Sequence, residues 1–120
     1  MRANVYFTRE ITPEKVVELY RALGVELPGK VAVKVHSGEK GNQNFLRPEF
    51  WCPMVEEVHG TIVECNTAYG DAAGGVRDHT ESHRKLLQEH GWTKYFDVDM
   101  MEAEGPDVVW PIPNGKVLKE

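Results

Sequence analysis

The chain has little cysteine, which limits the metal and redox chemistry that it can carry alone. Its 120 residues include two cysteines, Cys52 and Cys65. They are too few for a disulfide scaffold, too far apart for a C-x-x-C pair, and short of the four thiolates that an iron–sulfur cluster normally requires. The ordinary interpretation is two reduced thiols, with Cys52 packed among neighbouring apolar side chains.

The sequence also lacks a basic surface and a long apolar run. Fourteen basic against nineteen acidic residues give a net charge of -5, with no basic stripe, so we do not expect nucleic acid as a partner. No apolar run approaches the ~20 residues of a membrane span, and the amino terminus lacks the basic-then-apolar order of a signal peptide. We therefore expect a cytoplasmic protein with no membrane partner.

Strand and helix patterns alternate along the chain. Helices are predicted from Thr12-Pro13 to Gly24, from Pro48 onward, and over Val76–His90. Strands are predicted over Asn4–Thr8, Lys30–His36, Gly60–Cys65, Tyr95–Met100 and Val108–Ile112. This order predicts one α/β domain over residues 1–120, built as a three-layer α/β/α, Rossmann-like fold with a mainly parallel sheet of four or five strands.

Three local signals refine this picture. The near-continuous apolar run from Val31 to Val35 predicts a strand covered on both faces, with Lys34 as the exception. Pro53 predicts that the second helix is kinked or begins late. Asn114-Gly115 predicts a hairpin with a short return arm, and an edge of this kind favours a homo-oligomer in which a second copy covers it.

Polar loops follow two of the predicted strands, and the carboxyl ends of neighbouring parallel strands are where open α/β sheets hold ligands. Glu39 would repel phosphate, so these loops favour a cation or a hydroxylated ligand. The alternative is that their side chains cap turns and backbone groups. The candidate ligand-binding residues are Gly38, Glu39, Gly41, Asn42, Asn44, Asn66, Thr67 and Tyr69.

A histidine pair on the third helix suggests a divalent metal site. His79 and His83 are four residues apart, in phase with the apolar leucines of the helix, and this phase directs both toward Cys65. Imidazole and thiolate are zinc ligands, although the pair does not match the H-E-x-x-H signature. The alternative is that both imidazoles are hydrogen-bonded packing groups.

Several segments together resemble domain-of-unknown-function family 362. The resemblance rests on a Gly-Glu-x-Gly-Asn loop at 38–42, Phe-Leu-x-Pro at 45–48, the segment 64–69, and the helix with His83 and His90-Gly91-Trp92. It covers nearly the whole chain and corresponds to the amino-terminal portion of longer relatives. Many of those relatives carry [4Fe–4S] cysteine clusters in the part that would follow Glu120. The resemblance thus implies a redox association, but no cluster in this chain.

Two functions follow from these observations. The first is the ligand- or metal-binding part of an iron–sulfur-associated redox protein, completed by a ferredoxin-like segment or partner. The second is a noncatalytic α/β module that acts through self-association or a partner protein. The sequence predicts no particular reaction, so whether the chain is an enzyme stays open.

Overall fold

The computed structural model describes residues 3–68, 75–101 and 108–118. Its α-helices are α1 (Pro13–Leu23), α2 (Cys52–Val58) and α3 (Thr80–Glu89), its short 3-10 helices are η1 (Pro48–Trp51) and η3 (Trp92–Lys94), and its strands are β1 (Val31–Lys34), β2 (Gly60–Cys65) and β3 (Asp99–Met101). The alternation of strands and helices predicted from the sequence is confirmed between β1 and β3.

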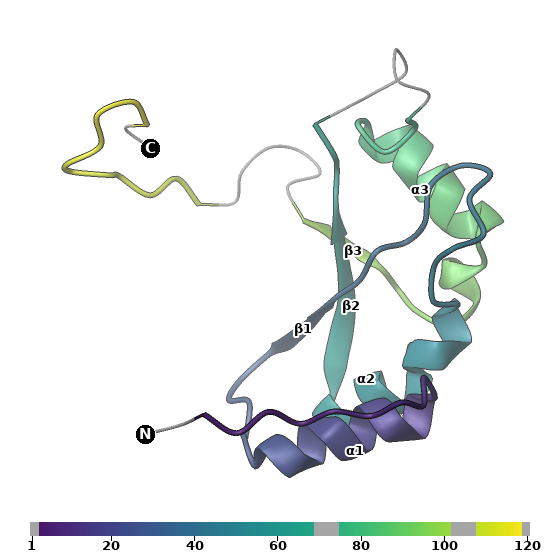
Figure 1. Cartoon of the computed structure of the whole chain (residues 1–120). Helices are drawn as coiled ribbons and strands as arrows, with labels where there is room; N and C mark the ends of the chain where they lie inside the picture. The colour runs from purple at the N-terminus through teal and green to yellow at the C-terminus, as the bar shows by residue number, and fades with distance from the viewer. Residues whose placement is uncertain (1–2, 69–74, 102–107, 119–120) are drawn as a thin grey trace.

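The strands form one parallel sheet. Its order is β1-β2-β3, and the register pairs Val33 with Ile62 and Glu64 with Met100. The prediction that the strands beginning near Val31 and Thr61 are parallel neighbours is therefore confirmed. Because the strands point the same way, their carboxyl ends lie at one edge, where the polar loops begin (Figure 1).

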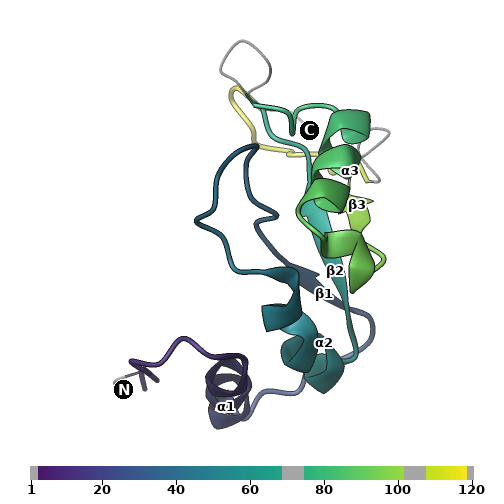
Figure 2. The same cartoon turned by 90° about the vertical axis from the view of Figure 1, so that its right-hand side faces the viewer.

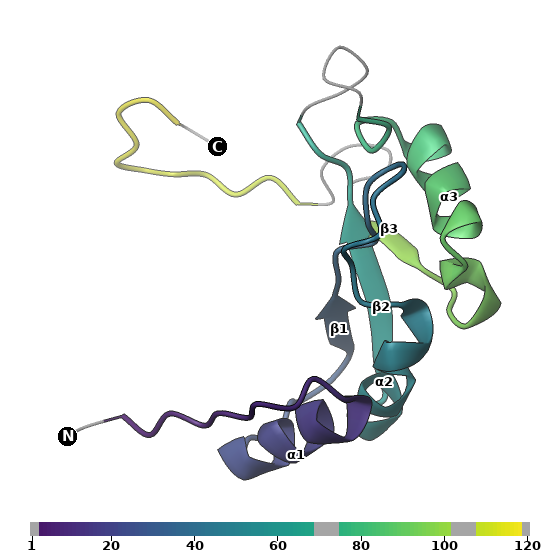
Figure 3. The same cartoon turned by 45° about the vertical axis from the view of Figure 1, so that its right-hand side comes forward.

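Helices α2 and α3 lie on the same face of the sheet (Figures 2 and 3). This arrangement agrees with right-handed crossovers between strands that follow one another in space. The core forms between that face and the helices. Its buried members are Val35, Ile62, Leu87, Trp92, Val98 and Met100.

Strand β1 is covered on one face rather than two. Val31 and Val33 are partly buried, whereas Ala32 and Lys34 are exposed. The prediction from the continuous apolar run was wrong because both crossover helices lie on the core face. Within the described residues, the sheet and these helices make two layers.

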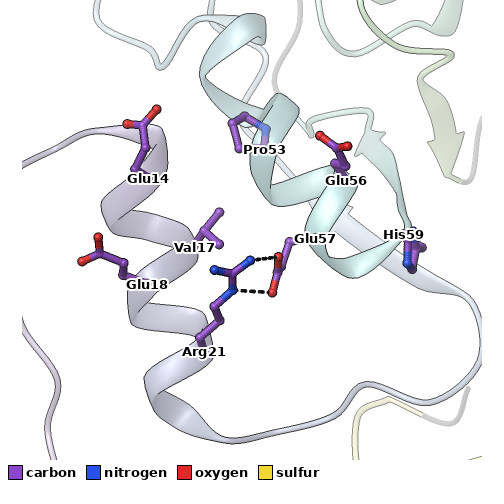
Figure 4. Close-up of a pocket in the computed structure, with 8 residues that line it drawn as sticks. All are labelled: Glu14, Val17, Glu18, Arg21, Pro53, Glu56, Glu57 and His59. Carbon is purple, nitrogen blue, oxygen red and sulfur yellow. Dashed lines mark hydrogen bonds and ion pairs between the residues drawn. The ribbon is translucent and has the colours of Figure 1, made fainter.

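Helix α1 begins and ends as its capping residues predict. The Thr12 hydroxyl accepts a hydrogen bond from the Lys15 amide at 3.3 Å, and Gly24 ends the helix in the left-handed region with φ 61°. The helix lies along α2, where Arg21 donates two hydrogen bonds to Glu57 at 2.7 and 2.6 Å (Figure 4).

The two later helices start after their predicted positions. Pro53 lies in the first turn of α2, after the 3-10 turn η1, so the prediction of a late helix start is confirmed. Helix α3 begins at Thr80 rather than Val76. The residues just before Thr80 are not helical. There the Arg77 carbonyl accepts a hydrogen bond from the Thr67 amide at 2.8 Å, in place of an amide of the helix.

Two predicted strands are absent from the described part of the chain. Residues 4–8 and 108–112 run away from the sheet without strand pairing (Figure 1), and the side chains of Phe7 and Trp110 are 79% and 77% exposed. A local preference for extended backbone gives a strand only where a neighbouring strand supplies hydrogen bonds. At Asn114-Gly115 a turn forms, with the Gly115 amide bonded to the Ile112 carbonyl at 3.0 Å, but no strands flank it.

The predicted strand over Tyr95–Met100 is shorter and later in the structure, because the 3-10 turn η3 comes before it and only Asp99–Met101 pairs with β2. Among the described residues, no helix has the length and apolar character needed to cross a membrane.

Candidate functional site

The candidate site lies at the carboxyl edge of the sheet, where the chain leaves β1 and β2. A buried carboxylate, Glu64, is at its centre, and its side chain is fully inaccessible. It accepts hydrogen bonds from the Lys34 ammonium at 2.5 Å, the Ser37 hydroxyl at 3.0 Å and the Arg77 guanidinium at 2.5 Å. The backbone amides of Ser37 and Cys65 also donate to it, at 3.1 and 3.0 Å.

These partners decide the charge of Glu64. Burial alone would raise the pKa of the carboxyl group, because desolvation disfavours the charged form. The hydrogen bonds from Lys34, Ser37 and Cys65 and the charge of Arg77 outweigh this effect and lower the pKa of Glu64 to about 2. Glu64 is therefore a carboxylate at neutral pH.

Arg77 joins Glu64 to the loop that follows β1. Its guanidinium is nearly buried and donates to Glu39 at 2.6 Å as well as to Glu64 at 2.5 Å. Its Nε also donates to His83 Nε2 at 3.3 Å. One side chain thus contacts residues from the loop after β1, from β2 and from α3.

The partners of His83 fix its tautomer. Because Arg77 Nε can only donate, His83 Nε2 is the acceptor, and Nδ1 carries the hydrogen toward Asn66 Oδ1 at 3.2 Å. Burial, followed by the charge of Arg77, lowers the pKa of His83 to about 4. The imidazole is therefore neutral at physiological pH.

Ser37, His83 and Asn66 have the order of a nucleophile, a base and an orienting group. The Ser37 hydroxyl lies 3.1 Å from His83 Nε2, but it also lies 3.0 Å from Glu64, and both Ser37 and His83 are fully buried. A nucleophile must reach its substrate. The geometry therefore favours a structural and electrostatic role for this group over nucleophilic catalysis.

The loop after β1 is also held by the C-cap residue of α3 and by η3. The Ser37 carbonyl accepts a hydrogen bond from Trp92 Nε1 at 3.0 Å and lies 2.9 Å from His90 Nδ1. Gly38 has φ +92°, and a Cβ there would lie 2.6 Å from the Phe45 ring. Only glycine fits this position without displacing the ring, which accounts for the glycine of the motif.

The predicted ligand residues divide into two groups. Glu39 and Asn66 contact the buried cluster directly. Others form turns: Asn42 Oδ1 accepts from the Asn44 amide at 2.7 Å, and Gly41 has φ +76°. Gly38 lies in the same loop. The Thr67 amide donates a hydrogen bond to the Arg77 carbonyl. Tyr69 lies outside the described residues.

The two histidines do not share one face of α3. His83 is fully buried, whereas the His79 side chain is 77% exposed. The prediction that both point inward was wrong because His79 is the N-cap residue, so the helical phase does not extend to it. Cys65 is partly buried. No group of three or more metal-ligating side chains gathers in the described residues, and the zinc site stays a prediction.

Sequence reasoning missed Glu64, Arg77 and Ser37 as site residues. A signal for Glu64 was present, since strand alternation places it on the same face as the buried Ile62. Lys34 was also a signal, since it is the one charged residue in the apolar run from Val31 to Val35. Arg77 lies in a loop, where no periodicity predicts the direction of a side chain.

The fold and the site together define a parallel α/β domain with a buried charged cluster at the carboxyl edge of its sheet. The model of the family called domain of unknown function (DUF362) matches residues 31–120, from the start of β1 onward. The chain belongs to the DUF362 family. No curated protein and no solved structure matches it.

The cluster predicts that acid destabilises the protein in two steps. The pKa of His83 is lowered from 6.5 to about 4 in the folded protein. As pH falls through this interval, His83 is protonated in the unfolded chain before it is protonated in the folded one, so stability falls. Glu64, lowered from 4.5 to about 2, contributes stability that is complete above 4.5 and is lost toward 2. We expect each step to cost roughly 2 to 3 kcal/mol, measured by urea unfolding at a series of pH values.

A matched pair of variants assigns the first step. His83→Gln should flatten the dependence between pH 6.5 and about 4, and His79→Gln, at an exposed position, should leave it unchanged. Wild-type stability that does not vary across this interval would contradict the assignment.

Proposed function

We propose that this domain binds a small polar ligand at the carboxyl edge of β1 and β2. The observation that carries the proposal is the convergence of Glu39, Glu64, Arg77 and His83 at that edge. Parallel sheets hold ligands at this position. Ionisable groups with strongly perturbed pKa values also gather at functional sites more often than elsewhere.

Stability alone is a weak reason for such a cluster. Burying ions costs several kcal/mol each, and apolar residues of similar size are often as stabilising as a buried ion pair. Here the ions join two loops that also present partly exposed polar groups, namely Glu39, Asn66 and Thr67. The cluster is therefore well suited to hold a ligand-binding surface in a fixed shape.

The chemistry of the edge favours a hydroxylated ligand or a cation. Carboxylate, amide and hydroxyl groups dominate the two loops. Their oxygen atoms bind hydroxyl groups, and the carboxylates also bind divalent cations such as Zn²⁺. Next to Arg77, Asp78 has a buried oxygen, Oδ1, to which no described residue donates a hydrogen bond. A ligand donor or a cation would satisfy such an oxygen.

The family context extends the proposal to a redox protein of the cytoplasm. We place the iron–sulfur chemistry in a ferredoxin-like segment or partner, because Cys52 and Cys65 are the only thiols of this chain and a cluster normally needs four. The proposal also includes a sheet of four or five strands in a three-layer, Rossmann-like fold, in which further strands and a second helix layer would add to the parallel sheet described here.

Amide chemical shifts test the ligand site. We expect Zn²⁺ or ribose, used as probes of the two ligand classes, to shift resonances of residues 37–44 and 64–67 and to leave α1 unchanged. Glu39→Ala should lower the affinity for whichever probe binds by about tenfold, because a hydrogen bond to a charged group is lost. Glu49→Ala, at an exposed position in η1, is the control.

Two results would overturn this proposal. One is that neither probe shifts these residues at millimolar concentration. The other is that the shifts occur elsewhere or are unaffected by Glu39→Ala.

One observation favours self-association as a second function. Residues 108–118 expose apolar side chains, including Val108 at 71%, Trp110 at 77% and Val117 at 90%, and β1 is at an edge of the sheet. Exposed apolar surface and open strand edges are places where a second copy pairs. We expect a dimer or larger oligomer in sedimentation velocity at micromolar concentration, weakened by Trp110→Ser. A strict monomer would exclude this function.

A further inference from the structure

Arg77 connects all the parts of the candidate site that the structure describes. Its Nη1 donates to Glu39, its Nη2 to Glu64 and its Nε to His83, at 2.6, 2.5 and 3.3 Å. Its carbonyl accepts a hydrogen bond from the Thr67 amide at 2.8 Å. The loop after β1 and the loop after β2 are therefore both attached to this one residue.

We propose that Arg77 is the positioning residue of the ligand site, and that it acts on the ligand through Glu39. The effect on a ligand rests on the proposed function, whereas the effect on the loop does not. Gly38 and Gly41 both have positive φ, at +92° and +76°. A loop with two glycines has much conformational freedom to lose, and the long-range contact from Arg77 restricts the position of the Glu39 carboxylate.

The three donors require an arginine. A guanidinium is planar and presents its N–H groups in a fixed fork, so it can bind two carboxylates and an imidazole nitrogen in different directions at once. A lysine ammonium keeps the charge but not this geometry. Arg77→Lys therefore separates the positioning role from the charge.

The same substitution at a second arginine gives a matched control. Arg21 also donates two hydrogen bonds to one glutamate, Glu57, but this pair joins α1 to α2 and lies outside the site (Figure 4). Arg21→Lys thus changes the same chemistry without touching the loops. Both variants are made in the full chain.

The first measurement is amide hydrogen exchange, without any ligand. In Arg77→Lys we expect the Asn42 amide, which bonds the Glu39 carbonyl at 3.0 Å, to exchange at least about tenfold faster. The Ile62 amide in the centre of β2 reports global unfolding, so its exchange should change only as much as the overall stability of the variant does. Both amides should be unchanged in Arg21→Lys. Unchanged exchange at Asn42 would overturn the positioning role.

The second measurement is a double-mutant cycle on the affinity for Zn²⁺ or ribose, whichever the wild type binds. If Arg77 acts through Glu39, Arg77→Lys weakens binding in the wild type but has no further effect in Glu39→Ala. Equal effects in both backgrounds would show that Arg77 does not act through Glu39, and would overturn the proposal.

The two measurements separate the possible failures. If the wild type binds neither probe, the proposed function fails while hydrogen exchange still decides whether Arg77 orders the loop. If Arg77→Lys does not fold, Glu39→Ala replaces it in the exchange experiment, because it breaks the same contact and leaves Arg77 bonded to Glu64.

Discussion

A buried carboxylate organises the carboxyl edge of this domain. Glu64 lies two residues after Ile62 in β2, so both side chains project from the same buried face of the strand. A buried carboxylate that water does not solvate is costly unless hydrogen-bond donors surround it. The chain supplies five, two of them cationic side chains and two of them backbone amides.

The arrangement of the loops follows from that requirement. Ser37 must turn back toward β2 so that its amide and its hydroxyl reach the carboxylate. Arg77 must leave the helical path, which explains why α3 begins at Thr80. Arg77 also donates to the Glu39 carboxylate through its other terminal nitrogen. The neutral His83 imidazole fits beside Arg77 because His83 Nε2 accepts a hydrogen bond from Arg77 Nε.

Much of this fold could be predicted from the sequence, because the signals are local. The caps of α1, the late start of α2 at Pro53 and the parallel pair β1 and β2 follow from nearby residues and strand composition. The edge that carries the candidate site could be predicted for the same reason. Glu39 and Asn66 are found there as expected.

The rest depends on contacts between distant residues. Residues 4–8 and 108–112 have the composition of strands, but no neighbouring strand pairs with them in the described structure. His79 was misplaced because helical phase does not apply to a cap residue. Arg77 reaches Glu39 and Glu64 across 38 and 13 positions of the chain, and no short-range pattern encodes such a contact.

The central claim is that the charge of Glu64 holds this edge together, and Glu64→Gln tests it most directly. The variant keeps the shape of the side chain but leaves Lys34 and Arg77 without their shared anion. Measured by urea unfolding at neutral pH, it should lose about 3 to 5 kcal/mol of stability, the usual cost of breaking a buried ion pair. Glu57→Gln, which weakens the exposed pair with Arg21, should lose far less. Equal losses in the two variants would contradict the account.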